Sequence, residues 1–291
     1  MLIFRGTLKT FPLEVERFRL APRYDFTQKP EVPEILYDQY DLGIKSEQWL
    51  KLCREASMKI KIGVSCQKLQ WRTERPEVGK VDFGDLARIE PISRIFGYDR
   101  GTPIDRPFIE EFLEKHRWDI CGRVLEIGDN SYTKQYGDNR VTESDVLHVK
   151  EGSPGATIIG DLSNAPHIAD NSFDCLILTQ VLVVIFDLQA TVATIHRILK
   201  PGGVALITVP GISNIDKGEW HDNWMWSFTP NSLRQLLLLN FSKEKIEVSS
   251  KGNIFTSISF LQGLSLEDLK CFPAAPDDPH YPQTVLGRAV K

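Results

Sequence analysis

The chain has 291 residues, of which 42% are hydrophobic and 25% charged, and these fractions are typical of a globular protein with a hydrophobic core. Its net charge of -4 at pH 7 gives it no bulk attraction to nucleic acid or to an anionic membrane. The longest nearly apolar run, residues 175–186, is too short to span a bilayer, which needs roughly 20 apolar residues. Five cysteines without a CxxC pair, and no signal-peptide pattern at the N-terminus, predict a reduced, cytoplasmic protein without a structural metal.

Proline and charged residues interrupt the first 95 residues, which differ in character from the rest of the chain. One helix is predicted there at residues 46–60, where four apolar side chains share a face. We expect residues 1–95 to form a mostly helical cap on a catalytic domain at residues 96–291. The alternative is a helical region that only packs on the sheet.

Further segments have the period and the end signals of helices. Thr102 can cap a helix and Pro103 suits its first position, ahead of a run of apolar side chains at helical spacing. From Asp187 a helical period continues until Lys-Pro-Gly-Gly at residues 200–203 stops it. Helices are also predicted at residues 229–239 and 257–264.

Short apolar runs between these segments predict buried strands. They lie at residues 123–127, 145–149, 156–159, 173–179, 204–209, 245–248 and 284–290. The order strand, helix, strand over residues 173–209 defines a βαβ unit, for which a parallel sheet with right-handed crossovers is expected. Alternation of this kind along the chain predicts a doubly wound α/β sheet.

The same unit carries a family resemblance. The sequences DNSFDCLILTQVL and RILKPGG, in this order and spacing, resemble the second half of a class I S-adenosylmethionine-dependent methyltransferase. The resemblance implies a Rossmann-like fold of this type, in which the strand at residues 284–290 is the antiparallel seventh strand. It also implies S-adenosylmethionine as the cofactor and a methyl acceptor as the partner.

A second set of sequences, FGYDRGTPIDR with VLEIGDNSYT and SDVLHV, resembles a subgroup of bacterial methyltransferases associated with sugar and cell-surface glycan biosynthesis. This resemblance covers about residue 82 to the C-terminus. Arg100 could pair with the methionine carboxylate of the cofactor, a contact that suits a guanidinium. The alternative is a surface ion pair of Arg100 with Asp99 or Asp105.

The loop after the first strand is the expected cofactor loop, because ligands of open parallel sheets bind beyond the carboxyl ends of the strands. Glu126 and Gly128 lie there, and in the family the loop usually reads GxGxG. Here Gly128 stands alone, so Asp129, Asn130 or Tyr132 would contact the cofactor through side chains. A loop that no longer binds the cofactor is the alternative.

Three further positions match the family's cofactor contacts. The second strand should end in an acid that takes the ribose hydroxyls, but Lys150 stands at that spacing. Either Glu151 takes this role through a shifted turn, or the ribose is held differently. Asp161 and Leu162 match the adenine position, with a helix cap as the alternative role for Asp161. Gln180 falls beside the methionine moiety, unless it is an ordinary polar residue at a strand end.

A hydroxyl acceptor must lose a proton during methyl transfer, and histidine is a common base. We predict His221 as that base and Asp222 as its orienting partner, in a tryptophan-rich segment at residues 219–226 that suits a sugar or ring. A packed surface loop is the alternative. His167 is a second candidate base, and His148 is expected to be structural.

The leading hypothesis is a methyltransferase that methylates a glycan or another small molecule, on oxygen. A second is a protein of this fold that binds the cofactor without methylating, or catalyses another reaction with it. A nicotinamide-dependent enzyme is disfavoured because no GxGxxG follows the first strand. A nucleic-acid methyltransferase is disfavoured because the chain lacks a basic stripe.

Overall fold

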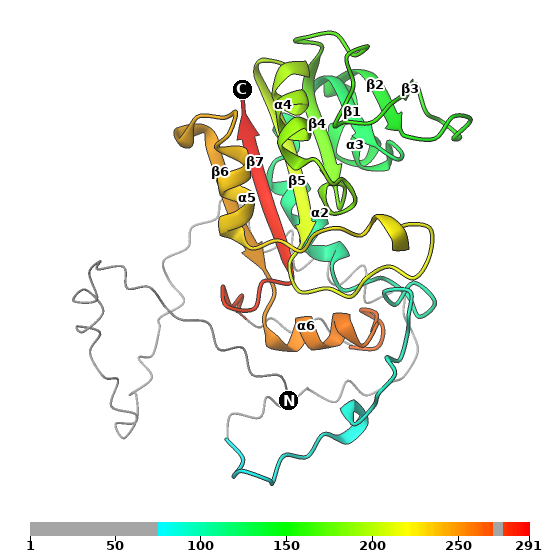
Figure 1. The fold of residues 1–291 in the computed structure, drawn as a ribbon, viewed down its shortest axis with the longest axis vertical. Helices are drawn as coiled ribbons and strands as arrows, with labels where there is room; N and C mark the ends of the chain where they lie inside the picture. The colour runs from blue at the N-terminus through cyan, green and yellow to red at the C-terminus, as the bar shows by residue number, and fades with distance from the viewer. Residues whose placement is uncertain (1–74, 270–275) are drawn as a thin grey trace, which may run out of the picture. The chain divides into compact units, whose positions relative to one another are not determined.

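A seven-stranded mixed sheet runs through the part of the chain that the computed structural model describes, residues 75–269 and 276–291 (Figure 1). The strand order across the sheet is β3-β2-β1-β4-β5-β7-β6. Strands β1 to β5 pair in parallel, and β7 is antiparallel to both β5 and β6. The strands are β1 (Gly122–Ile127), β2 (Val141–His148), β3 (Ile158–Ile159), β4 (Phe173–Thr179), β5 (Leu199–Pro210), β6 (Ile246–Lys251) and β7 (Thr284–Val290).

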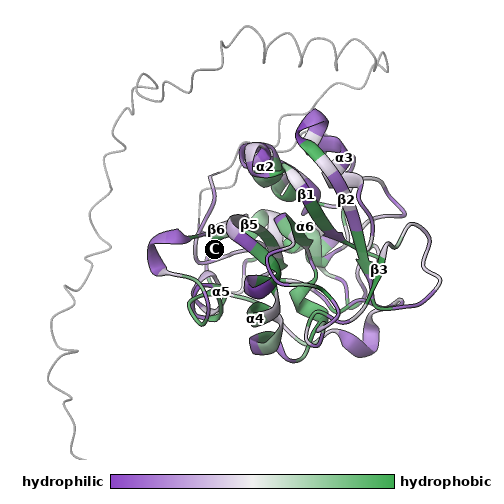
Figure 2. Cartoon of the chain, turned by 90° about the horizontal axis from the view of Figure 1, so that it is seen from above, coloured by the Kyte–Doolittle hydropathy of each residue, from purple (hydrophilic) through white to green (hydrophobic). Residues whose placement is uncertain are grey.

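Helices cover both faces of this sheet. Figure 2 shows α2 and α3 on one side and α4 and α5 on the other. The α-helices are α2 (Arg106–Lys115), α3 (Ser131–Gly137), α4 (Leu188–Ile198), α5 (Pro230–Leu237) and α6 (Ile254–Leu261). Short 3-10 turns are η2 (Gly84–Leu86), η3 (Arg117–Asp119), η4 (Asp138–Arg140), η5 (Leu182–Val184), η6 (His221–Asn223) and η7 (Lys243–Lys245). The doubly wound α/β fold predicted from the sequence is confirmed.

Burial on both faces explains the apolar run of β4. Leu176 and Leu178 belong to a core that includes residues of α4 and α5. Cys175 and Ile177 belong to a second core, which includes residues of α2. Successive side chains of a strand point to opposite faces, so a strand covered on both sides must be apolar throughout.

Local capping begins two helices where the sequence predicted. The Asp187 carboxylate accepts a hydrogen bond from the backbone N–H of Ala190 at 2.9 Å. Thr229 and Ser232 form a reciprocal capping box at the start of α5. Each side chain satisfies an N–H that the first helical turn leaves without a partner.

The start of α2 differs from the prediction. Thr102 and Pro103 do not begin the helix, which starts at Arg106 with Pro107 in its first turn. Thr102 instead donates from its backbone N–H to the Glu267 carboxylate at 2.8 Å, and Pro103 forms a β-bridge with Ser265. These contacts tie residues 102 and 103 to a distant segment, and the chain turns at Ile104 and Asp105 before the helix begins.

The predicted bounds of other elements shift for similar reasons. β5 begins at Leu199 rather than after Gly203, because Leu199 already has an extended backbone and pairs with Phe173. β2 begins at Val141, since its polar first half pairs with β1 although it carries no apolar pattern. β3 is shorter than predicted, and α6 begins at residue 254 rather than 257.

The helix predicted at residues 46–60 lies outside the described residues. Within the described part of the chain, no helix combines the length and the apolar character that crossing a membrane requires.

Candidate functional site

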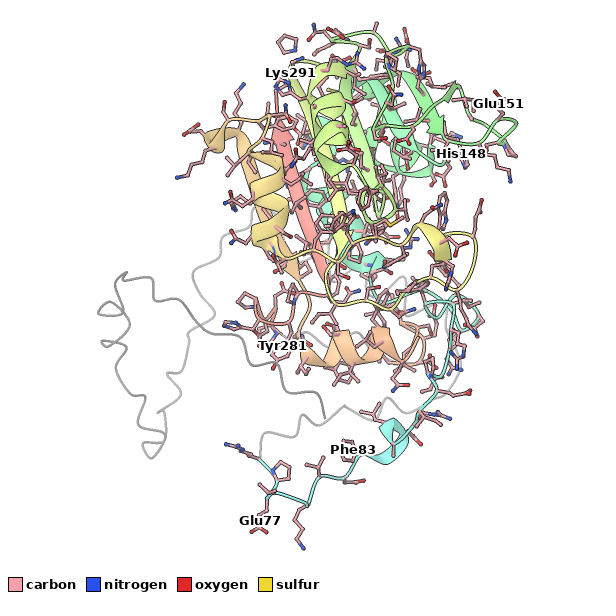
Figure 3. The ribbon with its side chains drawn as sticks, in the orientation of Figure 1. Glu77, Phe83, His148, Glu151, Tyr281 and Lys291 are labelled. Carbon is pink, nitrogen blue, oxygen red and sulfur yellow. The ribbon has the colours of Figure 1, made fainter. Side chains whose placement is uncertain are left out.

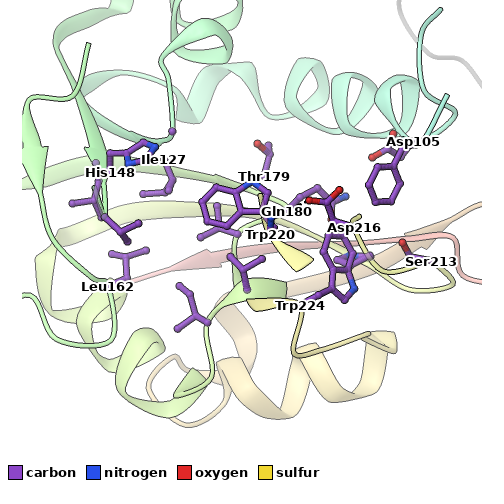
Figure 4. A pocket seen from close by; sticks show the side chains of 18 of the residues that line it. Asp105, Ile127, His148, Leu162, Thr179, Gln180, Ser213, Asp216, Trp220 and Trp224 are labelled. Atoms are coloured by element: carbon purple, nitrogen blue, oxygen red, sulfur yellow. Dashed lines mark hydrogen bonds between the residues drawn. The ribbon is translucent and has the colours of Figure 1, made fainter. Parts of the chain in front are cut away.

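A cavity of about 440 Å³ opens at the carboxyl ends of the parallel strands (Figure 4). One side of it, the strand-end side, is formed by residues at or after the ends of β1, β2, β3 and β4. A second group of rings, here called the aromatic wall, consists of Phe96, Trp220, Trp224 and Phe260. Figure 4 shows Asp105, Ser213 and Trp224 away from His148 and Leu162, so the cavity extends from the sheet edge to this wall.

Four of the predicted cofactor residues line the strand-end side. They are Gly128, Asp161, Leu162 and Gln180. Gly128 has a φ of 92°, and a Cβ placed on it would meet nothing within 4 Å. The cavity therefore has open space directly beside the backbone, where glycine permits a ligand to approach closely.

Glu126 organises the loop between β1 and α3. Its side chain is 2% exposed and accepts hydrogen bonds from the backbone N–H and hydroxyl of Thr133, at 2.8 and 2.7 Å. A third hydrogen bond comes from the Tyr132 N–H at 3.2 Å. Burial raises the pKa of Glu126 to about 7, although these donors oppose the rise. The carboxyl thus holds the first turn of α3 in a loop that has one glycine instead of three.

A smaller cavity of about 360 Å³ lies beside this loop. Glu126, Asp129 and Tyr132 line it, and Ile127 and Thr179 line both cavities. The predicted cofactor residues after β1 are thus brought next to those at the ends of the other strands.

Arg106, rather than Arg100, brings a guanidinium to these cavities. Arg100 donates to both carboxylate oxygens of Asp268, at 2.8 and 2.5 Å, and lines neither cavity. Arg106 lines both and donates to the phenol oxygens of Tyr132, at 2.9 Å, and Tyr98. Its hydrogen-bond partners among the described residues are phenols, and the carboxylate that interacts with its charge is the adjacent Asp105. The arrangement does not support the assignment of Arg100 to a ligand carboxylate.

At the end of β2, His148 occupies the place where the sequence analysis expected an acid. Glu151 is exposed and does not line the cavity, and Figure 3 shows it on the outside of the turn that follows His148. His148 lines the cavity, and its Nδ1 accepts the Lys150 N–H at 3.1 Å and lies 2.9 Å from the Ser153 hydroxyl. Acceptance at Nδ1 leaves Nε2 as the protonated nitrogen of the neutral ring. The sequence signal that was missed is simply that His148 ends the strand.

Gln180 lies at the centre of the site in a strained conformation. Its φ is 58°, a left-handed value that side chains rarely adopt, and its N–H donates to the Thr208 carbonyl at 2.8 Å. Its amide oxygen is buried and has no hydrogen-bond partner among the described residues. A buried acceptor without a partner is costly, which points to a donor supplied by a ligand. Phe96, on the aromatic wall, is a second non-glycine residue with a left-handed φ, also 58°.

The predicted base pair lies outside the cavity. His221 Nδ1 is 2.9 Å from the Asp222 carboxylate, but the two side chains are 63% and 96% exposed and line neither cavity. From the same segment, Asp216 and two tryptophans face inward. His167 is exposed and its ring lies against Gly160, where an added Cβ would come within 2.6 Å of it.

Asp216 and Asp105 are the carboxylates on the aromatic-wall side. Asp216 accepts the Trp220 N–H at 3.0 Å, which fixes the loop after β5. Asp105 is 8% exposed, and burial raises the pKa of its carboxyl. Among the described residues, no group of histidine, cysteine or acidic side chains has the arrangement of a metal site.

The chain is similar to a known protein family and to several solved structures. A family model described as a methyltransferase domain matches residues 124–207. The chain is similar to a SAM-dependent methyltransferase from Archaeoglobus fulgidus, with 14% identity over 64% of this chain and 94% of that one, at a TM-score of 0.42. It is also similar to the cyclase SpnF, with 15% identity over 70% and 88% of the two chains, at a TM-score of 0.45. It is similar as well to phosphoethanolamine N-methyltransferase 2 of Haemonchus contortus, whose structure is a complex with S-adenosylmethionine. The identity is 16% over 73% of this chain and 60% of that one, at a TM-score of 0.43.

Comparison with curated proteins found no match. The sheet order and the match over residues 124–207 show a class I methyltransferase fold, for which S-adenosylmethionine is the indicated cofactor. The residues of the strand-end side fit this cofactor. Open space beside Gly128 and the unpaired buried oxygen of Gln180 suit a ligand that carries both a flexible chain and hydrogen-bond donors.

Proposed function

We propose that the chain is an enzyme that transfers a methyl group from S-adenosylmethionine to a small-molecule acceptor. The observation that carries this proposal is the continuity of one cavity from the ends of the parallel strands to the aromatic wall. Such a cavity places a cofactor and an acceptor side by side, and alignment supplies much of the catalysis in a displacement reaction. Its volume of about 440 Å³ lies within the range of small-molecule sites.

Each part of the cofactor has a candidate holder. Asp161 and Leu162 would contact the adenine, the first by accepting from its amino group. His148, rather than Glu151, would donate to the ribose. Arg106 would pair with the methionine carboxylate, because a guanidinium suits that group.

Gly128 and Gln180 would lie beside the methionine chain, where the resemblance places their family counterparts. Bound there, the cofactor supplies a methyl group on a positively charged sulfur. The chain contributes orientation, exclusion of water and, where the acceptor must lose a proton, a base.

The leading hypothesis from the sequence is methylation on oxygen, in a glycan or another small molecule. Aromatic rings with polar neighbours suit a sugar face, which supports a glycan as one acceptor class. Since His221 and Asp222 lie outside the cavity, a hydroxyl acceptor would depend on Asp216 to take its proton.

The domain division at residue 95 is also a proposal. Residues 75–90 are exposed, whereas Ser93 is 5% exposed. The backbone N–H groups of Ile92 and Ser93 donate to Gln262, which follows α6. These contacts support a boundary close to residue 95, with the methyltransferase domain after it.

Calorimetric titration of the full chain with S-adenosylmethionine and S-adenosylhomocysteine tests the proposal. We expect micromolar binding of both and no binding of NADH. Asp161→Asn removes the free carboxylate oxygen but can still accept from the Ser163 N–H, so it should weaken binding about tenfold without unfolding the loop. Glu219→Gln, an exposed acid outside both cavities, is the matched control and should bind as the parent does.

An acceptor screen by mass spectrometry then follows the transfer of the methyl group. Absence of binding to either cofactor form would contradict the proposal. Binding without transfer to any acceptor would favour a protein of this fold that does not methylate, and NADH binding alone would favour a nicotinamide enzyme.

A further inference from the structure

We infer that the acceptor is an amine, so that the methyl group goes to nitrogen rather than to oxygen. This inference rests on the proposed methyl transfer and names the substrate class of the same cavity. Its basis is the combination of aromatic rings and the Asp216 carboxylate opposite the strand ends. Among the described residues that line the cavity, the one arginine, Arg106, is already assigned to the cofactor.

The aromatic wall is a rigid assembly of rings. Phe96 stacks on Trp224 with ring centroids 5.8 Å apart and planes 22° apart, and it contacts Phe260 at 5.7 Å. Phe96 has a left-handed φ of 58°, and the next residue, Gly97, packs so closely on Leu264 that an added Cβ would lie 2.7 Å from its carbonyl oxygen. The faces of such rings attract a cation, most strongly where water is excluded.

Carboxylates accompany these rings. Asp216 uses one oxygen to accept the Trp220 N–H, and no contact among the described residues is recorded for its other oxygen. Asp105 is buried at the same side of the cavity. Arg106 is the one cation of the described residues that lines this side, and it donates to the phenols of Tyr98 and Tyr132. Under the proposed function Arg106 pairs with the methionine carboxylate of the cofactor, so the acid that remains to face the acceptor is Asp216, whose charge suits an ammonium group.

The chemistry of proton removal agrees with an amine. No histidine or lysine of the described residues lines the aromatic-wall side, since His148 lies at the end of β2. A carboxylate is a weak base for an alkyl hydroxyl, whereas an ammonium gives up its proton far more readily. An amine acceptor therefore needs only the groups that are present.

The proposed transfer needs the amine, the sulfonium of the cofactor and the Asp216 carboxylate. The ammonium first loses one proton through the Asp216 carboxylate to solvent. The nitrogen lone pair then forms the new C–N bond as the C–S bond of the sulfonium breaks, with that bond's electron pair left on sulfur. The methylated amine carries the positive charge that the sulfonium had, and the same rings and carboxylate face that charge throughout.

Matched pairs of amines and alcohols test the inference on the full chain saturated with S-adenosylhomocysteine. The pairs are benzylamine with benzyl alcohol, and glucosamine with glucose, measured by titration calorimetry. We expect each amine to bind at least about tenfold more tightly than its partner. With S-adenosylmethionine in its place, mass spectrometry should find the added methyl on nitrogen.

Asp216→Asn is the decisive variant, because asparagine can still accept the Trp220 N–H while the charge is lost. It should cut the preference for amines at least about fivefold and leave the affinity for S-adenosylhomocysteine unchanged. Glu219→Gln, a neutralised acid in the same loop outside the cavity, should change neither value.

Equal or tighter binding of the alcohols would overturn the inference, and so would the absence of binding of all four probes. An unchanged preference in Asp216→Asn would overturn the role of this carboxylate. Failure of the proposed function is distinguishable, because then S-adenosylhomocysteine itself does not bind.

Discussion

Replacement of Glu126 by glutamine should remove a large pH dependence of stability. In the folded chain the pKa of this buried carboxyl is raised to about 7 from an ordinary value of 4.5. Each pKa unit corresponds to about 1.4 kcal/mol, so ionising Glu126 costs the folded state about 3 kcal/mol relative to the unfolded chain. Between these two pKa values the folded state binds the additional proton, and the free energy of unfolding falls as the pH rises through that window.

Below about pH 4.5 the carboxyl is protonated in both states and its contribution is fully present, and above about pH 7 the contribution is lost. Glu126→Gln keeps the acceptor for the Thr133 N–H but cannot ionise. The stability difference between parent and variant should therefore shift by about 3 kcal/mol in favour of the variant between pH 5 and 8.5.

Urea denaturation of both proteins across this pH range, at constant ionic strength, measures the shift. Glu151→Gln serves as a control, since this glutamate is exposed on the turn after β2. Parallel pH curves for the parent and Glu126→Gln would refute the reasoning, because they would mean that burial does not hold the proton on Glu126.

Three further predictions concern the cofactor, the acceptor and the sheet. His148→Ala should weaken binding of S-adenosylhomocysteine about tenfold in calorimetry, whereas Glu151→Gln should not. A larger loss of affinity in Glu151→Gln than in His148→Ala would mean that Glu151 contacts the ribose. Trp224→Leu removes the ring of the aromatic wall that stacks on Phe96. It should weaken binding of the amine probes about fivefold while S-adenosylhomocysteine binds normally. Equal losses of affinity for both ligands would indicate that the cavity has collapsed. Arg288→Gln loses two hydrogen bonds to the Asp119 carboxylate, at 2.7 and 2.9 Å, and should lower the free energy of unfolding by about 2 kcal/mol at pH 7. Burial raises the pKa of Asp119, but the hydrogen bonds from Arg288 contribute to a net lowering. The loss of stability in Arg288→Gln should therefore shrink as the pH falls below about 4 and Asp119 becomes protonated. Denaturation of both proteins at pH 3 and pH 7 measures this change.

Features encoded by neighbouring residues were predictable from the sequence. The bounds of β4 and β7 match their predicted runs, because each is apolar and bounded by turns. The caps Asp187 and Thr229 work through hydrogen bonds that span three residues, so a short stretch of sequence contains all the information. The doubly wound order follows from such elements taken together.

Features set by distant contacts were not predictable in the same way. The start of α2 was misplaced because the partners of Thr102 and Pro103 lie more than 150 residues further along the chain. The segment after β5, predicted to contact the acceptor, contributes residues to the lining of the cavity. Its sequence does not show which side chains face inward, and Asp216 rather than His221 does so.

The position of His148 shows a third kind of limit. The ribose contact was predicted from its spacing after Glu126, at Lys150 and Glu151, whereas β2 ends at His148. The end of β2 is set by its pairing with β3, in which His148 pairs with Ile159, and spacing along the chain does not show that pairing.

The pairing of Arg100 with Asp268, and of Thr102 with Glu267, joins the segment before α2 to the segment after α6. Phe96 and Phe260, which lie beside these contacts, form part of a wall that no single stretch of sequence contains. The match to a methyltransferase domain covers residues 124–207, which contain the strand-end side of the cavity and none of the aromatic wall. Under the proposed function, the residues that would contact the acceptor therefore lie outside the matched region. A graft that replaces this wall must carry both segments, because either segment alone would leave Arg100 or Asp268 without its partner.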